Sequence, residues 1–333
     1  MQRWSKEKAA AWYADRSRPM GFNYVTSNAV NDIEMWMDRT FSPALIEKEL
    51  GLAARAGFNS VRVFLSYAVW ENEKAVFEAN FERFLAIAAG QGLSVMPVLF
   101  DDCAFDFGSE PVYGTQPEPV PGVHNSRWVP CPGFKLQDDP EKREACLKFV
   151  DAIIGAHRED PRILIWDLYN EPGNTNRLGK CLPLLKDVFL RARALEPVQP
   201  LTAGLWCFST NEAANSFQLE ASDIISFHAY TPLERTKELV SEFSAQGRPL
   251  FITEWLHRPA GNGMAEHLPY FAKEKIGSWQ WGLIKGKTQT NLNWSTMNGG
   301  KPEPDPEVWQ HDIFYPDGTP YDPDEIKLIG SVR

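Results

Sequence analysis

The chain has 333 residues, of which 43% are hydrophobic and 23% charged, and its formal net charge is −10. This composition is typical of a globular protein and excludes disorder on a large scale. The negative charge, with no basic run along the chain, excludes nucleic acid and anionic membrane surfaces as partners. A neutral substrate fits such a chain better, and the sequence leaves the oligomeric state open.

The N-terminal segment MQRWSKEKAAAW is charged and lacks the apolar core of a secretory signal. Nowhere do about 18 apolar residues follow one another, as a membrane span requires. The sequence as it stands therefore predicts a cytoplasmic protein, and a secreted or periplasmic mature form stays open.

The five cysteines form no CxxC pair and do not alternate with histidine. This spacing argues against a zinc site and against a complete disulfide framework. Cys103 and Cys131, which fall in one long loop, are the only pair that we consider for a bridge.

The chain repeats one pattern, in which a short β-rich apolar run is followed by a polar and aromatic loop and then by a helix-like segment. This alternation is typical of parallel strands joined by helical crossovers. Eight runs fit the strand pattern, so the sequence predicts a single α/β domain, a closed (β/α)8 barrel over residues 1–333. The expected strands are Met20–Val25, Ser60–Leu65, Ser94–Phe100, Ile163–Tyr169, Pro200–Trp206, Asp223–His228, Leu250–Glu254 and Gly277–Leu283.

Helix signals lie between these strands. The stretch 42–57 begins with Ser42 at an N-cap position and ends at Gly57. Residues 141–160 form the clearest amphipathic run, whereas a proline interrupts the helix expected over residues 264–275. The two ends of the chain are expected to form helices that close the ends of the barrel.

Two connections are long: residues 101–139 follow the third expected strand, and residues 286–321 follow the eighth. In a barrel both lie at the C-terminal face of the strands, where active sites are built. We expect these two loops to form the walls of the substrate site, although they can equally be decorations.

The strongest chemical signal is PRILIWDLYNEPGN at residues 161–174, an apolar strand that ends in Asn170, Glu171 and Pro172. Strand alternation places Asp167 and Asn170 on opposite faces. A carboxylate at a strand end, beside an amide that can bond a sugar hydroxyl, is what a glycosidic acid/base needs. Taken alone, the motif is explained equally well by a turn after a strand.

A second acid interrupts the apolar strand RPLFITEWLHR at residues 248–258. Glu254 is costly in a core unless it is paired or functional, and Arg62, inside the apolar run SVRVFL, needs a carboxylate partner for the same reason. Arg62 and Tyr230 are natural hydrogen-bond donors that would keep Glu254 ionised. His228, two residues before Tyr230, can bridge toward the acid/base. A structural ion pair is the alternative reading of Glu254.

Tryptophans mark the last expected strand, where GSWQWGL alternates Trp279 and Trp281. One of them should face the barrel mouth, where an indole can stack on the apolar face of a pyranose ring, and we expect this to be Trp281. Trp206 and Trp255 are further stacking candidates. Each of these rings can instead belong to the apolar layer between barrel and helices.

Together, WDLYNEP, HAY, ITEW and SWQW, with Arg62, resemble clan A glycoside hydrolases, and most of all family 5, the cellulase-type family, from about residue 18 to 284. The resemblance implies a barrel enzyme that acts with retention on a β-glycoside, with Glu171 as acid/base and Glu254 as nucleophile. It implies no metal or organic cofactor. Glu171 should then have a raised pKa. Residues that resemble those contacting substrate or nucleophile in the family are Arg62, Asn170, His228, Tyr230 and Trp281.

The chain departs from the family at the end of the third strand, where many members have a histidine and this chain has Asp101 and Asp102. We expect these acids to bond sugar hydroxyls on the non-reducing side, which puts a cellulase preference in doubt; a loop-start acid and an ion-pair partner are the alternative. His124, Asn125 and Trp128 of the first long loop are expected to add polar and stacking groups to the sugar site.

The expected partner is therefore a carbohydrate, and the expected reaction is hydrolysis of β-linked neutral oligo- or polysaccharides of gluco-, manno- or xylo-type. Two bulky loops favour a pocket and exo-type action on short oligosaccharides, while endo-cleavage stays open. A non-catalytic carbohydrate-binding barrel is a rival that the two glutamates disfavour. A metal-dependent hydrolase using Asp101, Asp102, His124 and His228 is another, disfavoured by the absence of close histidine pairs.

Overall fold

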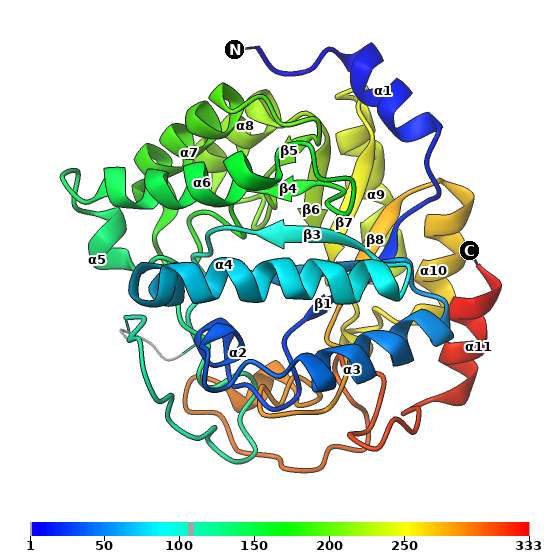
Figure 1. The fold of residues 1–333 in the computed structure, drawn as a ribbon. Coiled ribbons are helices and arrows are strands. Elements are labelled where there is room, and N and C mark those ends of the chain that lie inside the picture. The colour runs from blue at the N-terminus through cyan, green and yellow to red at the C-terminus, as the bar shows by residue number, and fades with distance from the viewer. Residues whose placement is uncertain (1, 106–109, 333) are drawn as a thin grey trace.

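The computed structural model describes residues 2–105 and 110–332, so residues 106–109 of the first long loop lie outside the described part (Figure 1). Eight parallel strands form one sheet in the order β5-β4-β3-β2-β1-β8-β7-β6, and the bridge between Leu205 and Phe227 joins its two edges. The predicted (β/α)8 barrel is confirmed. The strands are β1 Met20–Tyr24, β2 Ser60–Phe64, β3 Ser94–Val98, β4 Trp166–Asp167, β5 Leu201–Thr202, β6 Ile225–His228, β7 Leu250–Glu254 and β8 Gly277–Trp281.

All eight strands lie inside the predicted runs, but β4 and β5 are only two residues long. The chain leaves regular strand geometry after Asp167, so the alternation expected for residues 163–170 does not hold to its end. Asp167 and Asn170, predicted on opposite faces, both accept hydrogen bonds from the Arg62 guanidinium. This irregular stretch brings both side chains to the barrel mouth.

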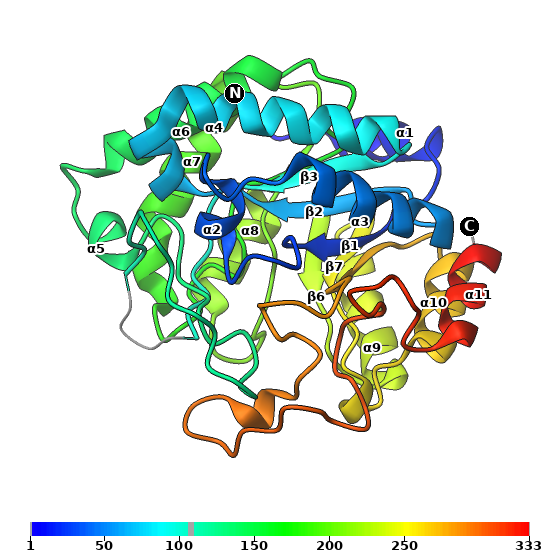
Figure 2. The same cartoon turned by 60° about the horizontal axis from the view of Figure 1, so that its bottom comes forward.

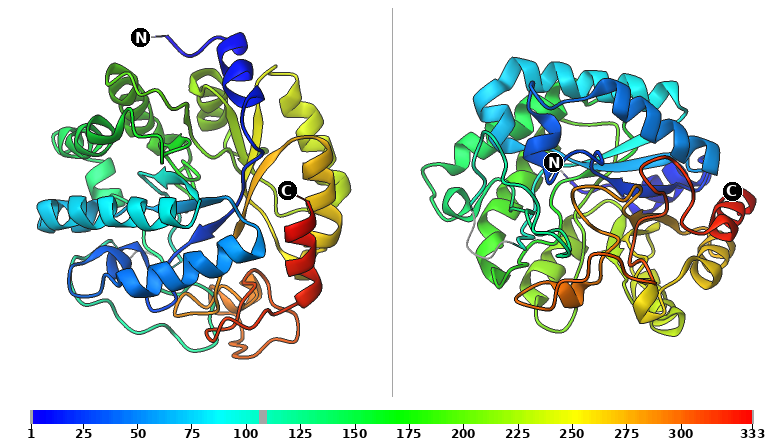
Figure 3. Two further views of the ribbon diagram at one scale, coloured as in Figure 1. Left: turned by 45° about the vertical axis from the view of Figure 1, so that its right-hand side comes forward. Right: turned by 90° about the horizontal axis from the view of Figure 1, so that it is seen from below.

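Helices surround the barrel between successive strands (Figure 3). The predicted helix over residues 42–57 is α3, with Gly57 in the left-handed conformation just past its end. Helix α10 runs through its internal Pro269 without a break. The helices of the described residues are α1 Lys6–Ala14, α2 Asp32–Trp36, α3 Pro43–Ala56, α4 Tyr67–Gly90, α5 Phe134–Gln137, α6 Arg143–His157, α7 Leu182–Ala194, α8 Glu212–Ala221, α9 Leu233–Ser244, α10 Met264–Lys273 and α11 Pro323–Ser331.

The two ends of the chain behave differently. Helix α1 covers the start of the strands, because Trp4 donates its backbone N–H to Asp223, just before β6, and Tyr13 packs on Phe251 of β7. Helix α11 lies beside α3 and α10 in the outer ring of helices and closes no end of the barrel (Figure 3). Among the described helices, none combines the length and apolar character needed to cross a membrane.

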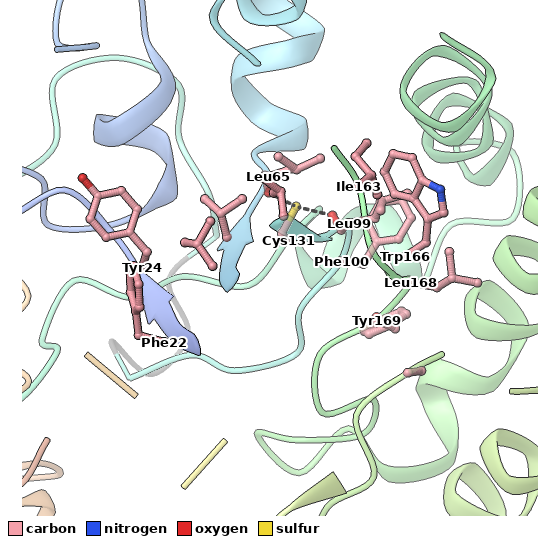
Figure 4. Close-up of a cluster of buried hydrophobic side chains, with 14 of the residues drawn as sticks. Phe22, Tyr24, Leu65, Leu99, Phe100, Cys131, Ile163, Trp166, Leu168 and Tyr169 are labelled. Carbon is pink, nitrogen blue, oxygen red and sulfur yellow. Dashed lines mark hydrogen bonds between the residues drawn. The ribbon is translucent and has the colours of Figure 1, made fainter. Parts of the chain in front are cut away.

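The main core fills the layer between the strands and the helices. Figure 4 shows part of it, with Phe22 of β1 and Trp166 of β4 among the buried side chains. Cys131 lies in the same region, with its thiol 3.4 Å from the carbonyl oxygen of Leu99 (Figure 4). Cys131 and Cys103 are both free thiols, so the bridge considered from the sequence does not form.

The two long loops meet above the barrel mouth (Figure 2). The backbone N–H of Asn125 donates to the carbonyl oxygen of Thr288 at 2.8 Å. The Gln289 side chain accepts from the N–H of Gly122 and donates to the carbonyl oxygens of Val120 and Val123. We call this contact, between residues 120–128 and 286–303, the loop bridge.

The loop bridge is also tied to the loop after β1. Lys287 donates its backbone N–H to the carbonyl oxygen of Ser27 at 2.9 Å. Gly286 lies so close to this backbone that a Cβ there would be 2.4 Å from the Ser27 oxygen, so only glycine fits. Loops from β1, β3 and β8 are thus joined into one wall.

Candidate active site

The C-terminal ends of the strands and the two long loops enclose one pocket of about 350 Å³. Its floor is formed by strand-end side chains, and its walls come from the loops after β3, β5 and β8. Residues lining it include Cys103, His124, Asn125, Trp128, Asn170, Glu171, Asn174, Trp206, His228, Tyr230, Glu254, Trp281, Trp294 and His311.

Glu254, the last residue of β7, has a donor on each carboxylate oxygen. Arg62 of β2 donates from Nη1 to Oε1 at 2.9 Å, and Tyr230 donates its hydroxyl to Oε2 at 2.9 Å. Burial raises the pKa of Tyr230 well above its usual value, so the hydroxyl keeps its proton and remains a donor. Both donors are those expected from the sequence, and together they fix the carboxylate and leave its oxygens facing the pocket.

Arg62 is fully buried and holds several strand ends together. Its Nε and Nη2 donate to Asp167 of β4, at 3.0 and 2.8 Å, and its Nη1 also donates to Asn23 of β1 at 2.6 Å. Nη2 donates to the amide oxygen of Asn170 at 2.6 Å, which directs the Asn170 NH₂ group away from the arginine. The buried Arg62 guanidinium therefore has two carboxylate partners, Asp167 and Glu254.

Glu171 follows β4 in a left-handed backbone conformation, with φ of 42°. A glutamate at this φ carries local strain of about 1 kcal/mol or more, of a kind that concentrates at functional sites. His228 donates from Nδ1 to Oε1 at 2.6 Å, and the Cys103 thiol donates to Oε2 at 3.1 Å. The Asn174 amide also donates to Oε2. Because burial raises the pKa of the Cys103 thiol well above its usual value, it stays protonated as a donor.

Glu171, His228 and Glu254 each place a polar atom within 4.8 Å of the other two. Carboxyl groups about 5–5.5 Å apart suit a covalent glycosyl-enzyme mechanism, whereas inverting enzymes need a wider gap. The same spacing could hold a cation. However, Arg62 and Tyr230 already bond both oxygens of Glu254, and a guanidinium would repel a metal ion there.

The pKa values of the two carboxyls move in opposite directions. Burial raises the pKa of Glu254, and the charge of Glu171 adds to this, while His228 and Arg62 act against it. Burial also acts to raise the pKa of Glu171, but the hydrogen bond and charge of His228 outweigh it, and the pKa is lowered. The lowered pKa of Glu171 is the reverse of the raised pKa expected from the sequence.

His228 is held in place by the backbone of the loop after β5. A Cβ on Gly204 would lie 2.7 Å from His228 Nε2, so the imidazole fits only because position 204 is glycine. The opposite nitrogen, Nδ1, is thereby directed at Glu171 and lies 3.4 Å from Glu254 Oε2. One imidazole nitrogen is thus within reach of both carboxylates.

Among the predicted aromatic and loop residues, Trp281, Trp206, His124 and Trp128 all line the pocket. Trp255 does not. Successive side chains on a strand point to opposite faces, so the residue after Glu254 faces outward, where its ring packs on Phe271 of α10.

Asp101 and Asp102 also point away from the pocket, into the protein. Asp101 accepts hydrogen bonds from the Trp128 indole at 2.7 Å and from the Asn170 amide at 2.8 Å. Asp102 accepts from the Tyr169 hydroxyl and the Gly173 N–H. Burial raises the pKa of Asp101 to about 8 and that of Asp102 to about 6. The two acids therefore position pocket residues, whereas we had expected them to bond the sugar.

Sequence reasoning missed Cys103, Asn174 and Asp167 as parts of the site. Cys103 was considered only for a disulfide, although it directly follows two acids at a strand end. Asn174 lies three residues after Glu171 in a turn rich in Asn and Gly, which is a weak signal. Asp167 could have been found by asking which second acid balances a buried arginine.

The pocket carries no positive side chain among its described lining residues apart from titratable histidines. Burial lowers the pKa of His124 to about 4, and it lowers that of His311 well below its usual value, so both rings are neutral near pH 7. Two carboxyls surrounded by indoles, amides and neutral imidazoles suit an uncharged polyol. An anionic sugar would be repelled.

The chain matches the cellulase family, glycosyl hydrolase family 5, over residues 16–300. No curated protein matches it. Among solved structures, a variant of GH5_18 from Streptomyces cattleya in complex with Manb1-4GlcNAc has a TM-score of 0.67 at 14% identity, covering 95% of this chain and 80% of that one.

Two other solved structures also share the fold. The endo-β-1,4-mannanase from Thermotoga petrophila has a TM-score of 0.59 at 13% identity, covering 96% of this chain and 77% of that one. The exo-β-1,4-mannosidase from Opitutaceae bacterium strain TAV5 has a TM-score of 0.61 at 15% identity, covering 95% of this chain and 60% of that one.

Proposed function

Because the chain belongs to glycosyl hydrolase family 5 and is an O-glycosyl hydrolase, we propose that it cleaves β-glycosides with retention, using Glu254 as nucleophile and Glu171 as acid/base. We propose that residues 1–333 form one catalytic domain. The observation that carries it is the placement of the two carboxyls around His228, with atoms within 4.8 Å of one another. This spacing supports double displacement.

The first step forms a covalent intermediate. Glu254 attacks the anomeric carbon, the bond to the glycosidic oxygen breaks, and Glu171 gives its proton to the departing oxygen. This requires the proton on Glu171 and an ionised Glu254. His228 Nδ1 lies 2.6 Å from Glu171 and 3.4 Å from Glu254, so it can accept a proton from Glu254 and then pass it to Glu171.

The second step releases the sugar. Once Glu254 is esterified, its negative charge is gone, which lowers the pKa of Glu171 further and makes it a base. Glu171 then removes a proton from water, the oxygen of which attacks the anomeric carbon and displaces Glu254. The configuration at the anomeric carbon is retained because it is inverted twice.

The loop bridge supports exo-type action. In a barrel, the loop after β3 must pass over β2 and β1 to reach the loop after β8, and here it does so through the contacts of Asn125 and Gln289. This wall stands beside Trp281, the proposed platform of the sugar that is attacked. A chain end fits such a pocket, whereas a polymer running through it would meet the wall.

The proposed substrates are short, neutral, β-linked oligosaccharides of gluco-, manno- or xylo-type. β-Mannosides come first in a test panel, because the solved structures with this fold include a mannanase, a mannosidase and a complex with a mannose-containing ligand. Endo-action on a β-1,4-glycan is the second candidate, supported by the mannanase likeness. Uronic acids are left out of the panel, because the described lining of the pocket holds two carboxyls and no lysine or arginine to pair with the acid group of the sugar.

The deciding experiment is a panel of aryl β-glycosides and β-linked oligosaccharides, with the first-formed anomer followed by NMR. We expect the β-anomer first, with single sugars released from the non-reducing end. An α-anomer formed first would contradict retention. Full recovery of every oligosaccharide despite binding would favour a carbohydrate-binding protein, and loss of activity on chelation, restored by a divalent ion, would favour a metal-dependent hydrolase.

A further inference from the structure

Asn125, in the first long loop, lines the pocket and is 1% exposed. In the part of the chain that the structure describes, neither its amide oxygen nor its amide nitrogen has a hydrogen-bond partner. A buried side-chain amide with both ends unpaired is unfavourable and rare in proteins. Its neighbours in the sequence, His124 and Ser126, both use their polar atoms within the protein.

The backbone holds Asn125 firmly. Its N–H donates to Thr288 of the other loop at 2.8 Å, and its carbonyl oxygen accepts from the N–H of Trp128 at 3.1 Å. Its φ of 44° lies in the left-handed region, which asparagine tolerates better than most residues. The backbone that carries the amide is therefore fixed in the pocket wall.

The position of Asn125 relates it to the sugar that is attacked. The Trp128 ring packs edge-on against Trp281, with ring centroids 5.8 Å apart. Trp281 and Glu254 line the same pocket as Trp128 and Asn125. A pyranose stacked on Trp281 with its anomeric carbon at Glu254 would therefore share this pocket with the Asn125 amide.

We propose that the Asn125 amide recognises two neighbouring hydroxyls on the terminal, non-reducing sugar, its nitrogen donating to one and its oxygen accepting from the other. The inference rests on the proposed function and adds a specificity-determining residue to it. The ligand it requires is a sugar with two free hydroxyls remote from the anomeric carbon, either the vicinal pair on C3 and C4 or, in a hexose, the 1,3-related pair on C4 and C6. A sugar substituted there would be excluded.

The test pairs enzyme variants with substrate analogues. Asn125→Gly keeps the left-handed backbone and removes both polar atoms, whereas Asn125→Asp keeps the shape and removes the donor. The substrates are the aryl β-glycoside that the wild type turns over best and its 3-deoxy, 4-deoxy and 6-deoxy forms. Asn298→Gly is the matched control, because Asn298 is also left-handed, with φ of 55°, but is exposed in the other loop.

We expect the wild type to lose about 10- to 100-fold in kcat/KM when a recognised hydroxyl is removed. Asn125→Gly should lose a similar factor on the parent substrate and be insensitive to removal of that same hydroxyl. Asn125→Asp should lose sensitivity at one of the two positions. Asn298→Gly should behave as the wild type on all four substrates.

Two outcomes overturn the inference in distinguishable ways. If the wild type is active and Asn125→Gly loses the same factor on the parent and on every deoxy substrate, Asn125 recognises no hydroxyl, and the proposed function stands. If the wild type cleaves no aryl β-glycoside, the proposed function fails and this inference fails with it. Circular dichroism and thermal melting of each variant show whether a loss reflects misfolding.

Discussion

The strand-end floor of the pocket and the loop bridge above it are built in opposite ways. On the floor, Arg62, His228 and Tyr230 bond the two carboxyls through charge-assisted contacts between strands. In the bridge, neutral backbone and amide groups join two loops, and the Asn125 amide is unpaired at both its oxygen and its nitrogen. The difference teaches that the groups proposed for bond breaking and those proposed for choosing the sugar sit on separate parts of the molecule and can be altered separately.

The largest effect should come from the floor. Glu254→Gln removes the proposed nucleophile and keeps its size, so we expect kcat to fall on the order of 10⁶-fold, as when a nucleophile is lost from other hydrolases. The loss should be the same for activated and unactivated substrates. Measuring kcat for a dinitrophenyl glycoside and for a disaccharide checks this.

Glu171→Ala should separate the two classes of substrate. We expect a loss of about 10²–10⁴-fold on a disaccharide, whose leaving group needs a proton, and little loss of the first step on a dinitrophenyl glycoside, whose leaving group does not. A burst of dinitrophenol followed by slow turnover is the readout. Equal losses on both substrates would undo the assignment of roles to the two glutamates.

His228→Ala should move the pH profile. The hydrogen bond and charge of His228 lower the pKa of Glu171 and act against the raised pKa of Glu254. Without the imidazole both pKa values rise. Activity needs one proton on the coupled pair, with Glu171 protonated and Glu254 ionised. The two limbs of the profile of kcat/KM therefore belong to the pair, and both should shift to higher pH.

A profile of Gly204→Ala gives an independent check, since a Cβ there displaces the imidazole without removing it. An unchanged alkaline limb in both variants would contradict the role given to His228.

A change in the loop bridge should alter which substrates are cleaved more than it alters the rate of bond cleavage. Gln289→Ala removes three hydrogen bonds between the loops and should lower the free energy of unfolding by about 1–3 kcal/mol. We expect turnover of an aryl glycoside within about 3-fold of the wild type, but more internal cleavage of a long β-glycan. Lys301→Ala, at an exposed residue of the same loop, is the control.

The smallest effect is expected at Cys103. Cys103→Ala removes one donor from Glu171, which raises the pKa of that carboxyl and shifts the alkaline limb upward by less than in His228→Ala. Cys103→Ser keeps a donor and should restore the wild-type limb. If serine and alanine behave alike, the thiol does not act through this hydrogen bond.

The sequence predicted the floor well, because it depends on strand ends, and the order of strands in a barrel is set by chain order. Arg62, Tyr230 and Glu254 come from three apolar runs, and a buried charge in such a run must meet its counterpart inside the barrel. His228 could be placed beside Glu171 for the same reason. The prediction for the floor that was wrong is the strand alternation past Asp167, where regular strand pairing ends.

The walls could not be predicted in the same way. Which way Asp101 and Asp102 point depends on the path of a long loop, and they turned inward to hold Asn170 and Tyr169. Trp255 faces outward because it follows the nucleophile on the same strand, a consequence of alternation that we did not apply. Nothing local in the sequence distinguishes Asn125 from a loop asparagine exposed to solvent, since its burial depends on a partner loop more than 160 residues later.

The loop bridge also determines how the protein would respond to polymer length. If the proposed exo-type action holds, the wall of residues 120–128 and 286–303 stands beyond the proposed sugar platform, and a chain reaches Glu254 by its tip. The concentration that matters is then that of chain ends, so the same mass of glycan is consumed faster when it is supplied as shorter pieces. An enzyme that cuts the polymer internally would multiply the substrate of this one with every cut.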